Sequence, residues 1–251
     1  MKKTKIIVPA LGLLLLSTAA SVTGTVAWFA ANRIVTASGM SVTVKSDSTF
    51  LLIQAAPVEG ENDAAKVATI QGTKATSATA TSASAQLLPV AHDTLQTSDG
   101  ISVIEGATDG TSNKWYTDFS NDPASATGSG STTHIASASF ANYVLVNEFD
   151  MTIAVGGNSM TNLKVDTCTI APSAGGDQAV KVLVATASGC EEFSGTGGTG
   201  SNVLQSSLSS STLMVAKVYI YWDGADTDVY SNNLANLLST SVTVTFTGTV
   251  A

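Results

Sequence analysis

The chain has 251 residues and a formal net charge of −8, and only 12% of its residues are charged, about half of the roughly 25% found in average globular proteins. The acidic balance argues against nucleic acid and anionic membranes as partners, because both would repel it. Hydroxyl-bearing and small residues replace the missing charges, a pattern typical of an exported structural or adhesive protein rather than a cytosolic enzyme.

The first 27 residues have the pattern of a secretory signal. Three lysines within the first five positions precede an uncharged stretch over residues 6–31. Small residues occupy the −3 and −1 positions of a cut after Ala27, which predicts Trp28 as the mature N-terminus. The alternative is a retained anchor, since the uncharged stretch exceeds the ~20 residues that span a bilayer. The small, weakly apolar second half favours cleavage, and predicts a secreted or cell-surface protein.

An apolar segment, residues 28–45, follows the predicted cut and leads into an alternating strand pattern. Such a segment can add to the sheet edge of a neighbouring subunit through backbone hydrogen bonds. Head-to-tail addition does not close, so it makes filaments. Alternatively, the segment folds back as the first strand of its own sandwich. The two arrangements are compatible if the segment pairs within the free subunit and then moves to a neighbouring subunit in the fibre. The predicted contact residues are Trp28, Phe29, Ile34, Val35, Met40, Val42 and Val44.

Period-2 alternation predicts strands along most of the remaining chain. Residues 143–155 and 242–246 alternate apolar and polar side chains, which is typical of a sheet with one buried face. Other runs are apolar on both parities, which predicts central strands or strands covered on both sides: residues 50–53, 180–185 and 213–222. The helical signal is poor, with residues 232–238 as the best candidate. The pattern predicts an all-β antiparallel sandwich over residues 46–251, with at most short helices.

Low-complexity sequence interrupts these strands. Stretches rich in Ser, Thr, Ala and Gly predict long surface loops: residues 72–86, 124–133 and 194–201. Residues 60–135 as a whole are predicted to be an insertion on the sandwich, with Trp115, Tyr116 and Phe119 giving it a small core of its own.

Cys168 and Cys190 are the only cysteines. An even count in an exported chain predicts one disulfide. In the chain-entropy model this bond would close a loop of about 21 residues and stabilise the fold by about 3 kcal/mol. The alternative is two free thiols in a reducing setting.

Few residues are candidates for chemistry. Asp223, Asp226 and Asp228 share one acidic loop and are candidate Ca²⁺ ligands. A solvated acidic turn without a metal is the favoured alternative. No other cofactor is predicted. His92 and His134 are the only histidines, and neither sits in a zinc-binding helix motif or beside a nucleophile elbow. The chain is therefore not predicted to be an enzyme.

The junction between signal and first strand carries a family resemblance. Residues 24–32 read Gly-Thr-Val-Ala-Trp-Phe-Ala-Ala-Asn, and residues 37–42 read Ala-Ser-Gly-Met-Ser-Val. This resembles the TasA/camelysin family of exported biofilm-matrix fibre proteins, and residues 219–224 and 242–246 are similar to it in outline. The resemblance implies a jelly-roll-like sandwich whose subunits polymerise when the N-terminal strand of one fills a groove in the next. The insertion and the cysteine pair depart from that pattern.

We therefore expect an exported structural subunit that self-assembles into extracellular fibres. The expected partners are further copies of the same chain and other matrix or cell-surface components. One alternative is a monomeric cell-surface adhesin or carbohydrate-binding module, with Trp115, Tyr116 and Trp222 as stacking platforms. Another is a secreted hydrolase, such as a protease, that uses His92 or His134.

Overall fold

The computed structural model describes residues 51–80, 87–106, 113–116, 134–135, 137–171, 180–224 and 241–251. All of them belong to one compact unit, Ala37–Ala251. No helix within these residues is long and apolar enough to span a membrane. The predicted strand at Val42 and Val44 and the candidate helix at 232–238 lie outside the described residues.

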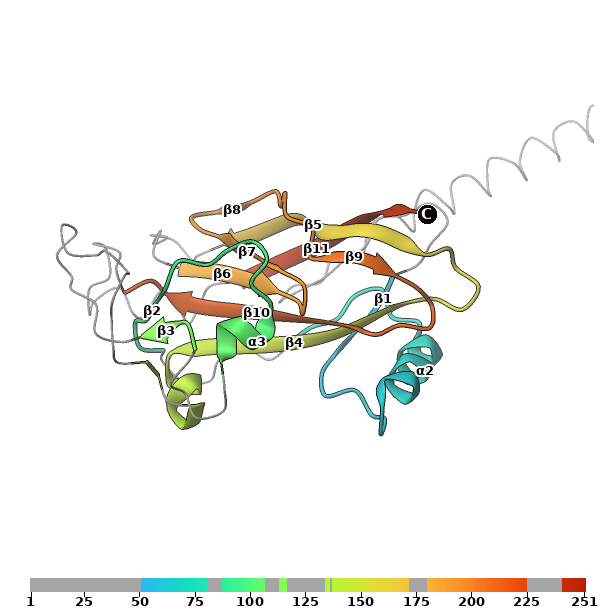
Figure 1. Ribbon diagram of the computed structural model, residues 1–251, viewed down its shortest axis with the longest axis horizontal. Helices are drawn as coiled ribbons and strands as arrows, with labels where there is room; N and C mark the ends of the chain where they lie inside the picture. The colour runs from blue at the N-terminus through green and yellow to red at the C-terminus, as the bar shows by residue number, and fades with distance from the viewer. Residues whose placement is uncertain are drawn as a thin grey trace, which may run out of the picture. The chain divides into compact units, whose positions relative to one another are not determined.

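Two antiparallel sheets form the layers of a sandwich (Figure 1). The larger sheet has the order β1-β4-β10-β6-β7, with the following bounds: β1 Leu51–Ala55, β4 Val144–Ile153, β10 Met214–Trp222, β6 Val180–Ala185 and β7 Cys190–Phe193. In the smaller sheet β5, Met160–Ala171, pairs with three strands, which have these bounds: β11 Ser241–Val250, β8 Gly197–Gly198 and β9 Gln205–Leu208. The predicted all-β sandwich is confirmed.

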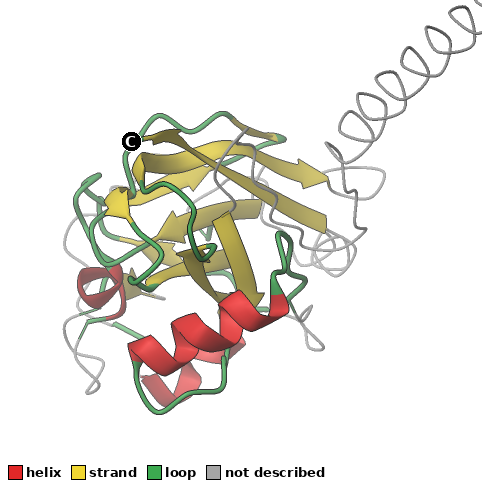
Figure 2. Ribbon diagram, turned by 90° about the vertical axis from the view of Figure 1, so that its right-hand side faces the viewer, coloured by secondary structure: helices red, strands yellow, loops and turns green. Residues whose placement is uncertain are grey.

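The helices all lie on the far side of the five-stranded sheet from the smaller sheet (Figure 2). They are α2 Asp63–Thr73, α3 Ile101–Glu105 and the 3₁₀ helix η1 Ser137–Asn142. A two-stranded ribbon, β2 Ala91–His92 with β3 Trp115–Tyr116, belongs to the same covering layer. The five-stranded sheet is therefore covered on both faces.

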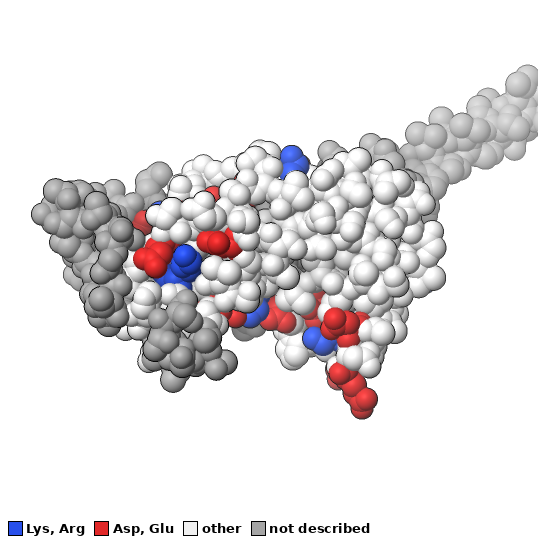
Figure 3. All heavy atoms as spheres, in the orientation of Figure 1, with Lys and Arg blue, Asp and Glu red and all other residues white. Residues whose placement is uncertain are grey.

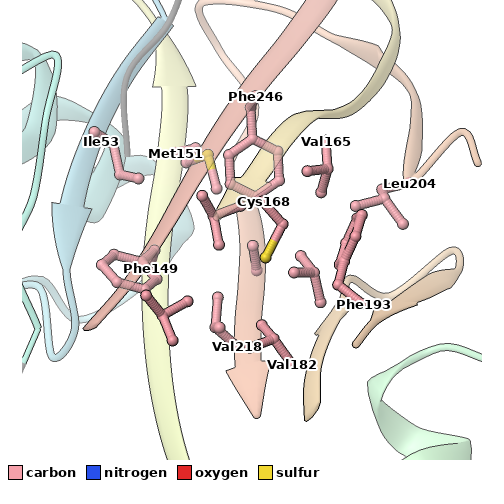
Figure 4. Close-up of a cluster of buried hydrophobic side chains, with 14 of the residues drawn as sticks. Ile53, Phe149, Met151, Val165, Cys168, Val182, Phe193, Leu204, Val218 and Phe246 are labelled. Carbon is pink, nitrogen blue, oxygen red and sulfur yellow. The ribbon is translucent and has the colours of Figure 1, made fainter. Parts of the chain in front are cut away.

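The main core fills the space between the two sheets. Phe246 from β11 and Val165 and Cys168 from β5 face Phe149, Val218 and Val182 of the five-stranded sheet (Figure 4). Along β11 the buried positions Val242, Val244 and Phe246 alternate with half-buried threonines, as the period-2 pattern predicts. β4 contributes Phe149, Met151 and Ile153 to this core, whereas Asp150 and Thr152 between them are buried outside it.

β10 is the central strand of the larger sheet and is buried on both faces. Val218, Ile220 and Trp222 enter the core between the sheets, whereas Tyr219 and Tyr221 point into a second apolar cluster on the opposite face. The prediction of a central strand from a run apolar on both parities is confirmed here and at β6.

The described residues of the 60–135 segment share a core with the five-stranded sheet, so Trp115 does not belong to a separate small core, contrary to the prediction. Trp115 is fully buried, and its ring packs edge-on against Tyr221, with centroids 4.9 Å apart, and lies beside Tyr219. The described part of the segment thus covers the outer face of the five-stranded sheet. Phe119 lies outside the described residues.

Part of this segment is helical rather than looped. The Asn62 side chain accepts a hydrogen bond from the Ala65 amide at 3.0 Å and caps α2, which is the usual role of Asn at a helix start. Val67 and Ile70 are the buried positions of this helix. Two buried apolar residues give too short a pattern for a helical period to be recognised in the sequence.

The low-complexity stretch that begins at Gly72 is predicted to be a surface loop. Gly72 and Thr73 close α2, and residues 74–80 form a loop of exposed and half-buried residues that lies against the sandwich. The Ala75 carbonyl accepts a hydrogen bond from the Ile53 amide, and Ala78 and Ala80 pack against the main core. Alanine can fill narrow space at the end of a core while polar neighbours face solvent. Residues 81–86 lie outside the described ranges.

Replacing Phe246 with Ala removes the largest side chain that β11 contributes to the core. We expect the free energy of unfolding to fall by about 3–5 kcal/mol, because the loss combines transfer energy with a cavity. Urea unfolding of the purified chain measures this. Thr249→Ala, at an exposed position of the same strand, is the matched control and should change stability by less than about 0.5 kcal/mol. Equal effects of both substitutions would contradict the placement of Phe246.

Candidate functional site

The candidate assembly segment lies outside the described residues. This holds for the predicted cleavage site, Ala27 and Trp28, and for all seven contact residues between Trp28 and Val44. The described residues bear on the other half of the predicted interaction, the sheet edge that would receive such a segment.

β11 is the candidate acceptor edge. It pairs with β5 from Ser241 to Val250, and no other described strand pairs with it. Its sequence, Ser-Val-Thr-Val-Thr-Phe-Thr-Gly-Thr-Val, contains neither a charge nor a proline, the two residue classes that usually blunt an edge. Register irregularities begin only after Thr245. The first half of β11 is therefore a regular strand whose backbone groups can pair with an added strand.

The edges of the larger sheet are more fully covered. At β1 the Ile53 amide donates to the Ala75 carbonyl, and at β7 the Cys190 amide donates to the Thr97 carbonyl. A surface over β5 and β9 with few charged side chains lies on the same layer as β11 (Figure 3), whereas charges gather toward the five-stranded sheet. The candidate edge thus lies on the less charged layer of the sandwich.

The predicted disulfide is wrong, and both cysteines are free and buried. The Cys168 side chain lies between the sheets with Val182 and Val184, whereas Cys190 lies with Leu183 and Ala185 on the outer face of the larger sheet. Neighbouring residues of β6 thus point to opposite faces, and the sheet itself separates the two sulfurs. Spacing along the chain carries no information about the face on which a side chain lies.

Burial makes both thiols unreactive. It raises the pKa of the Cys168 thiol to about 12. Burial, assisted by the carboxylates of Asp99, Glu192 and Glu191, raises the pKa of Cys190 to about 11. Because the thiolate is the reactive form, neither side chain is a nucleophile at neutral pH.

The acidic loop places one carboxylate in an ion pair. Asp223 Oδ2 lies 2.6 Å from Lys181 Nζ, while Asp226 and Asp228 lie outside the described residues. Within the described ranges no group of three or more His, Cys, Asp or Glu side chains could hold a metal ion. The calcium site stays a prediction.

A polar cluster around His92 joins the covering layer to the five-stranded sheet. His92 Nε2 lies 2.9 Å from Glu192 Oε1 and 2.7 Å from the Tyr221 hydroxyl, and the hydroxyl itself donates to Glu192. His92 Nδ1 lies 2.8 Å from the Asp93 carbonyl. Backbone bonds between Val90 and Trp222 and between Gly224 and Val90 hold the same segment along the end of β10.

The charges in this cluster favour an imidazolium. Burial would lower the pKa of His92, but the hydrogen bond and charge of Glu192 and the Asp93 carbonyl outweigh it, so this pKa is raised above 6.5 despite Lys181. Burial would raise the pKa of Glu192, but His92, Tyr221 and Lys181 lower it to about 2. Both ring nitrogens of His92 are engaged, which suits an anchoring ion pair better than a general base.

A second cluster anchors the covering layer farther along β10. Lys217 Nζ lies 2.9 Å from both carboxylate oxygens of Glu105, and the Tyr219 hydroxyl donates to Glu105 at 2.9 Å. Burial and the Glu105 charge raise the pKa of Tyr219. Glu148 adds an ion pair to Lys217 at 3.6 Å. The two clusters place the scarce charges of the chain where α3 and β2 meet the sheet.

The aromatic residues proposed as sugar-stacking platforms are not exposed. Trp115 and Trp222 are fully buried and Tyr116 is 4% exposed. A stacking platform needs an open ring face, so these three residues cannot supply one. Sequence composition identifies aromatic residues but not which of them are needed by the core.

Comparisons of the chain with protein-family models, with curated proteins and with solved structures return no match.

Two free thiols lead to a chemical prediction. Thiol-specific alkylation without reductant should label no cysteine of the folded chain on the scale of minutes and both cysteines after denaturation, because burial and the raised pKa values suppress thiolate formation. Intact mass spectrometry counts the labels. A chain that gains labels only after reduction would contradict the free-thiol assignment.

The His92–Glu192 pair predicts a pH dependence of stability. Because the folded pKa of His92 is raised, its contribution is full below the ordinary value near 6.5 and is lost as pH rises through the folded value. Because the folded pKa of Glu192 is lowered, its contribution is present above the ordinary value near 4.5 and is lost as pH falls toward about 2. The pair therefore stabilises most between these limits.

We expect His92→Gln to cost about 2 kcal/mol near the acidic optimum, the scale of a hydrogen bond to a charged group, and less at alkaline pH. Urea unfolding at about pH 5 and about pH 9 measures the difference. Adding Glu192→Gln in a double-mutant cycle isolates the pair. A coupling energy that does not change with pH would argue against the imidazolium.

Proposed function

We propose that the chain is an exported structural subunit that self-assembles into extracellular fibres. Residues 28–44 of one subunit add as a strand to the open edge of β11 in the next. The observation that carries the proposal is β11 itself, a strand of ten residues without charge or proline whose second edge has no partner among the described strands. Such an edge is a template for pairing with another chain.

Dimensions support this pairing. A strand rises ~3.3 Å per residue, so residues 28–44 are long enough to run along the whole of β11. Backbone hydrogen bonds would supply affinity, and the apolar side chains of the segment would supply specificity by occupying alternate pockets.

The topology supports a filament rather than a closed dimer. The donor segment precedes β1, while the acceptor edge belongs to the other sheet. Donor and acceptor are different surfaces, so each added subunit offers a new edge, and a heterologous contact that does not close gives an open fibre. Only 12% of the residues of the chain are charged, so charge repulsion between packed subunits is weaker than it would be for a densely charged protein.

Two observations weigh against the alternatives. The adhesin alternative depended on exposed aromatic residues, and Trp115, Tyr116 and Trp222 are buried. The hydrolase alternative named His92 or His134; both ring nitrogens of His92 are engaged, whereas Nδ1 of His134 is buried with no hydrogen-bond partner among the described residues.

Fibre formation is the test of this proposal. Chain 28–251 should form filaments visible by electron microscopy, and deletion of 28–45 should abolish them. Thr243→Lys introduces a charge on the candidate edge and should raise the critical concentration about tenfold or more, equivalent to about 1.4 kcal/mol per contact. Thr169→Lys adds the same charge directly opposite on β5, away from that edge, and should leave assembly near the level of the parent chain.

Two outcomes would contradict the proposal. A monodisperse monomer from the intact mature chain across pH and salt would exclude self-assembly. Equal inhibition by Thr243→Lys and Thr169→Lys would exclude the β11 edge as the acceptor.

A further inference from the structure

A lysine and a buried aspartate face each other between α2 and β4. Asp150 is fully buried on the face of β4 opposite to Phe149 and Met151. Lys66, whose side chain is 28% exposed, reaches it from the first turns of α2, with Nζ 3.7 Å from Asp150 Oδ2. The helix cap at Asn62 and the packing of Val67 and Ile70 hold the lysine over this position.

The aspartate has no hydrogen-bond partner among the described residues. Neither of its carboxylate oxygens has one, and the side-chain oxygen of Gln54, its register partner on β1, also lacks one. A distance of 3.7 Å is too long for a hydrogen bond from Lys66. Buried carboxylates are normally hydrogen-bonded, since an unpaired one costs several kcal/mol. An ordinary ion pair therefore does not explain why Asp150 is buried without hydrogen bonds beside Lys66.

We propose that Lys66 and Asp150 condense to an intramolecular amide bond that cross-links α2 to β4. The reaction joins Lys66 Nζ to Asp150 Cγ and breaks one Cγ–O bond. An ammonium and a carboxylate give an amide and one water molecule, so of the three ammonium protons one stays on the amide nitrogen and two leave with the oxygen. No oxidant, reductant or external reagent is needed.

Burial favours the protonated form of Asp150. It raises the pKa of Asp150, against the charge of Lys66 and with the help of Glu148. In a poorly hydrated site, transfer of a proton from the ammonium to the carboxylate removes both charges. The products are an amine, which is a nucleophile, and a carboxylic acid, which is an electrophile. Holding them in contact replaces the bimolecular encounter that makes amide formation slow in water.

We assign proton transfer in this step to Glu148, whose carboxylate also lies 3.6 Å from Lys217 Nζ. It lies two residues before Asp150, so its side chain emerges on the same face of β4. It lines, with Lys66, a cavity of about 400 Å³ that also borders Ala55, Pro57 and Asn147. Its carboxylate can take a proton from the nitrogen and return it to the departing oxygen. The cavity gives the released water a place to go.

The test is the mass of the folded full chain after purification. The cross-linked chain should be lighter than its polypeptide by about 18 Da, the mass of one water. Tandem mass spectrometry of a tryptic digest should find the peptide containing Lys66 joined to that containing Asp150, with no cleavage after Lys66. The full polypeptide mass with a linear Lys66 peptide would overturn the proposal.

Three variants separate this bond from other causes of mass loss. Lys66→Arg keeps a cation facing Asp150, but a guanidinium stays protonated and is not a nucleophile, so the full mass should return. Asp150→Ala should do the same. Glu148→Gln keeps both reacting groups and should reduce the cross-linked fraction at a fixed time about tenfold or more.

The remaining outcomes are equally decisive. A loss of about 17 Da would indicate release of ammonia from an amide such as Asn147, whose Nδ2 is buried without a partner, and would overturn the assignment to Asp150. A loss of water that persists in Lys66→Arg would place the dehydration elsewhere. Cross-linking unchanged in Glu148→Gln would remove Glu148 from the reaction.

Discussion

Burial of the five-stranded sheet on both faces is the constraint on which the rest of the structure depends. One face packs against β5 and β11, and the other packs beneath α2, α3 and the β2–β3 ribbon. A strand such as β10, with apolar side chains on both parities, has no stable place at a solvent-facing surface. The described part of residues 60–135 is therefore a cover for this sheet rather than a separate module.

The same constraint explains where the few charges lie. Covering a sheet brings polar side chains out of water, and each must then find a partner. His92 with Glu192 and Lys217 with Glu105 meet this need at two points where the cover contacts β10. Lys66 and Asp150 occupy the corresponding place beneath α2, but without hydrogen bonds. Of the three contacts, this is the one whose geometry suggests covalent chemistry.

Strands were predictable where apolar residues kept one parity over long runs, as in β11 and β4, or were apolar on both parities, as in β6 and β10. Prediction failed where the parity of the buried positions changed within a strand. β5 was missed although it is the longest described strand, because its buried positions change parity twice, after Met160 and after Val165. Asn162 has a positive φ, and the register with β11 shifts beside Phe246, so local backbone irregularity hides the period-2 pattern.

The site was less predictable than the fold because sites depend on which faces meet. The cysteine count and spacing were compatible with a disulfide, yet Cys168 and Cys190 lie on opposite sides of a sheet. In the same way nothing in the sequence brings Lys66 to Asp150, since 83 intervening residues separate them. Only the packing of α2 on β1 and β4 creates that pair. From the sequence alone, only Glu148 and Asp150 could have been placed together, because they lie two residues apart on one strand.

The proposed bond and the proposed assembly have a mechanical connection. In a fibre joined through residues 28–44 and β11, tension enters each subunit through the chain that precedes β1. β1 pairs with β4 in antiparallel register from Leu51 to Ala55, so an applied force could peel it from the sheet one residue pair at a time. α2 follows β1 directly, and a covalent link from Lys66 to Asp150 would halt peeling before it reached the covering layer. A non-covalent ion pair at 3.7 Å could not bear such a load, which is a physical reason for a fibre subunit to carry a bond at this position.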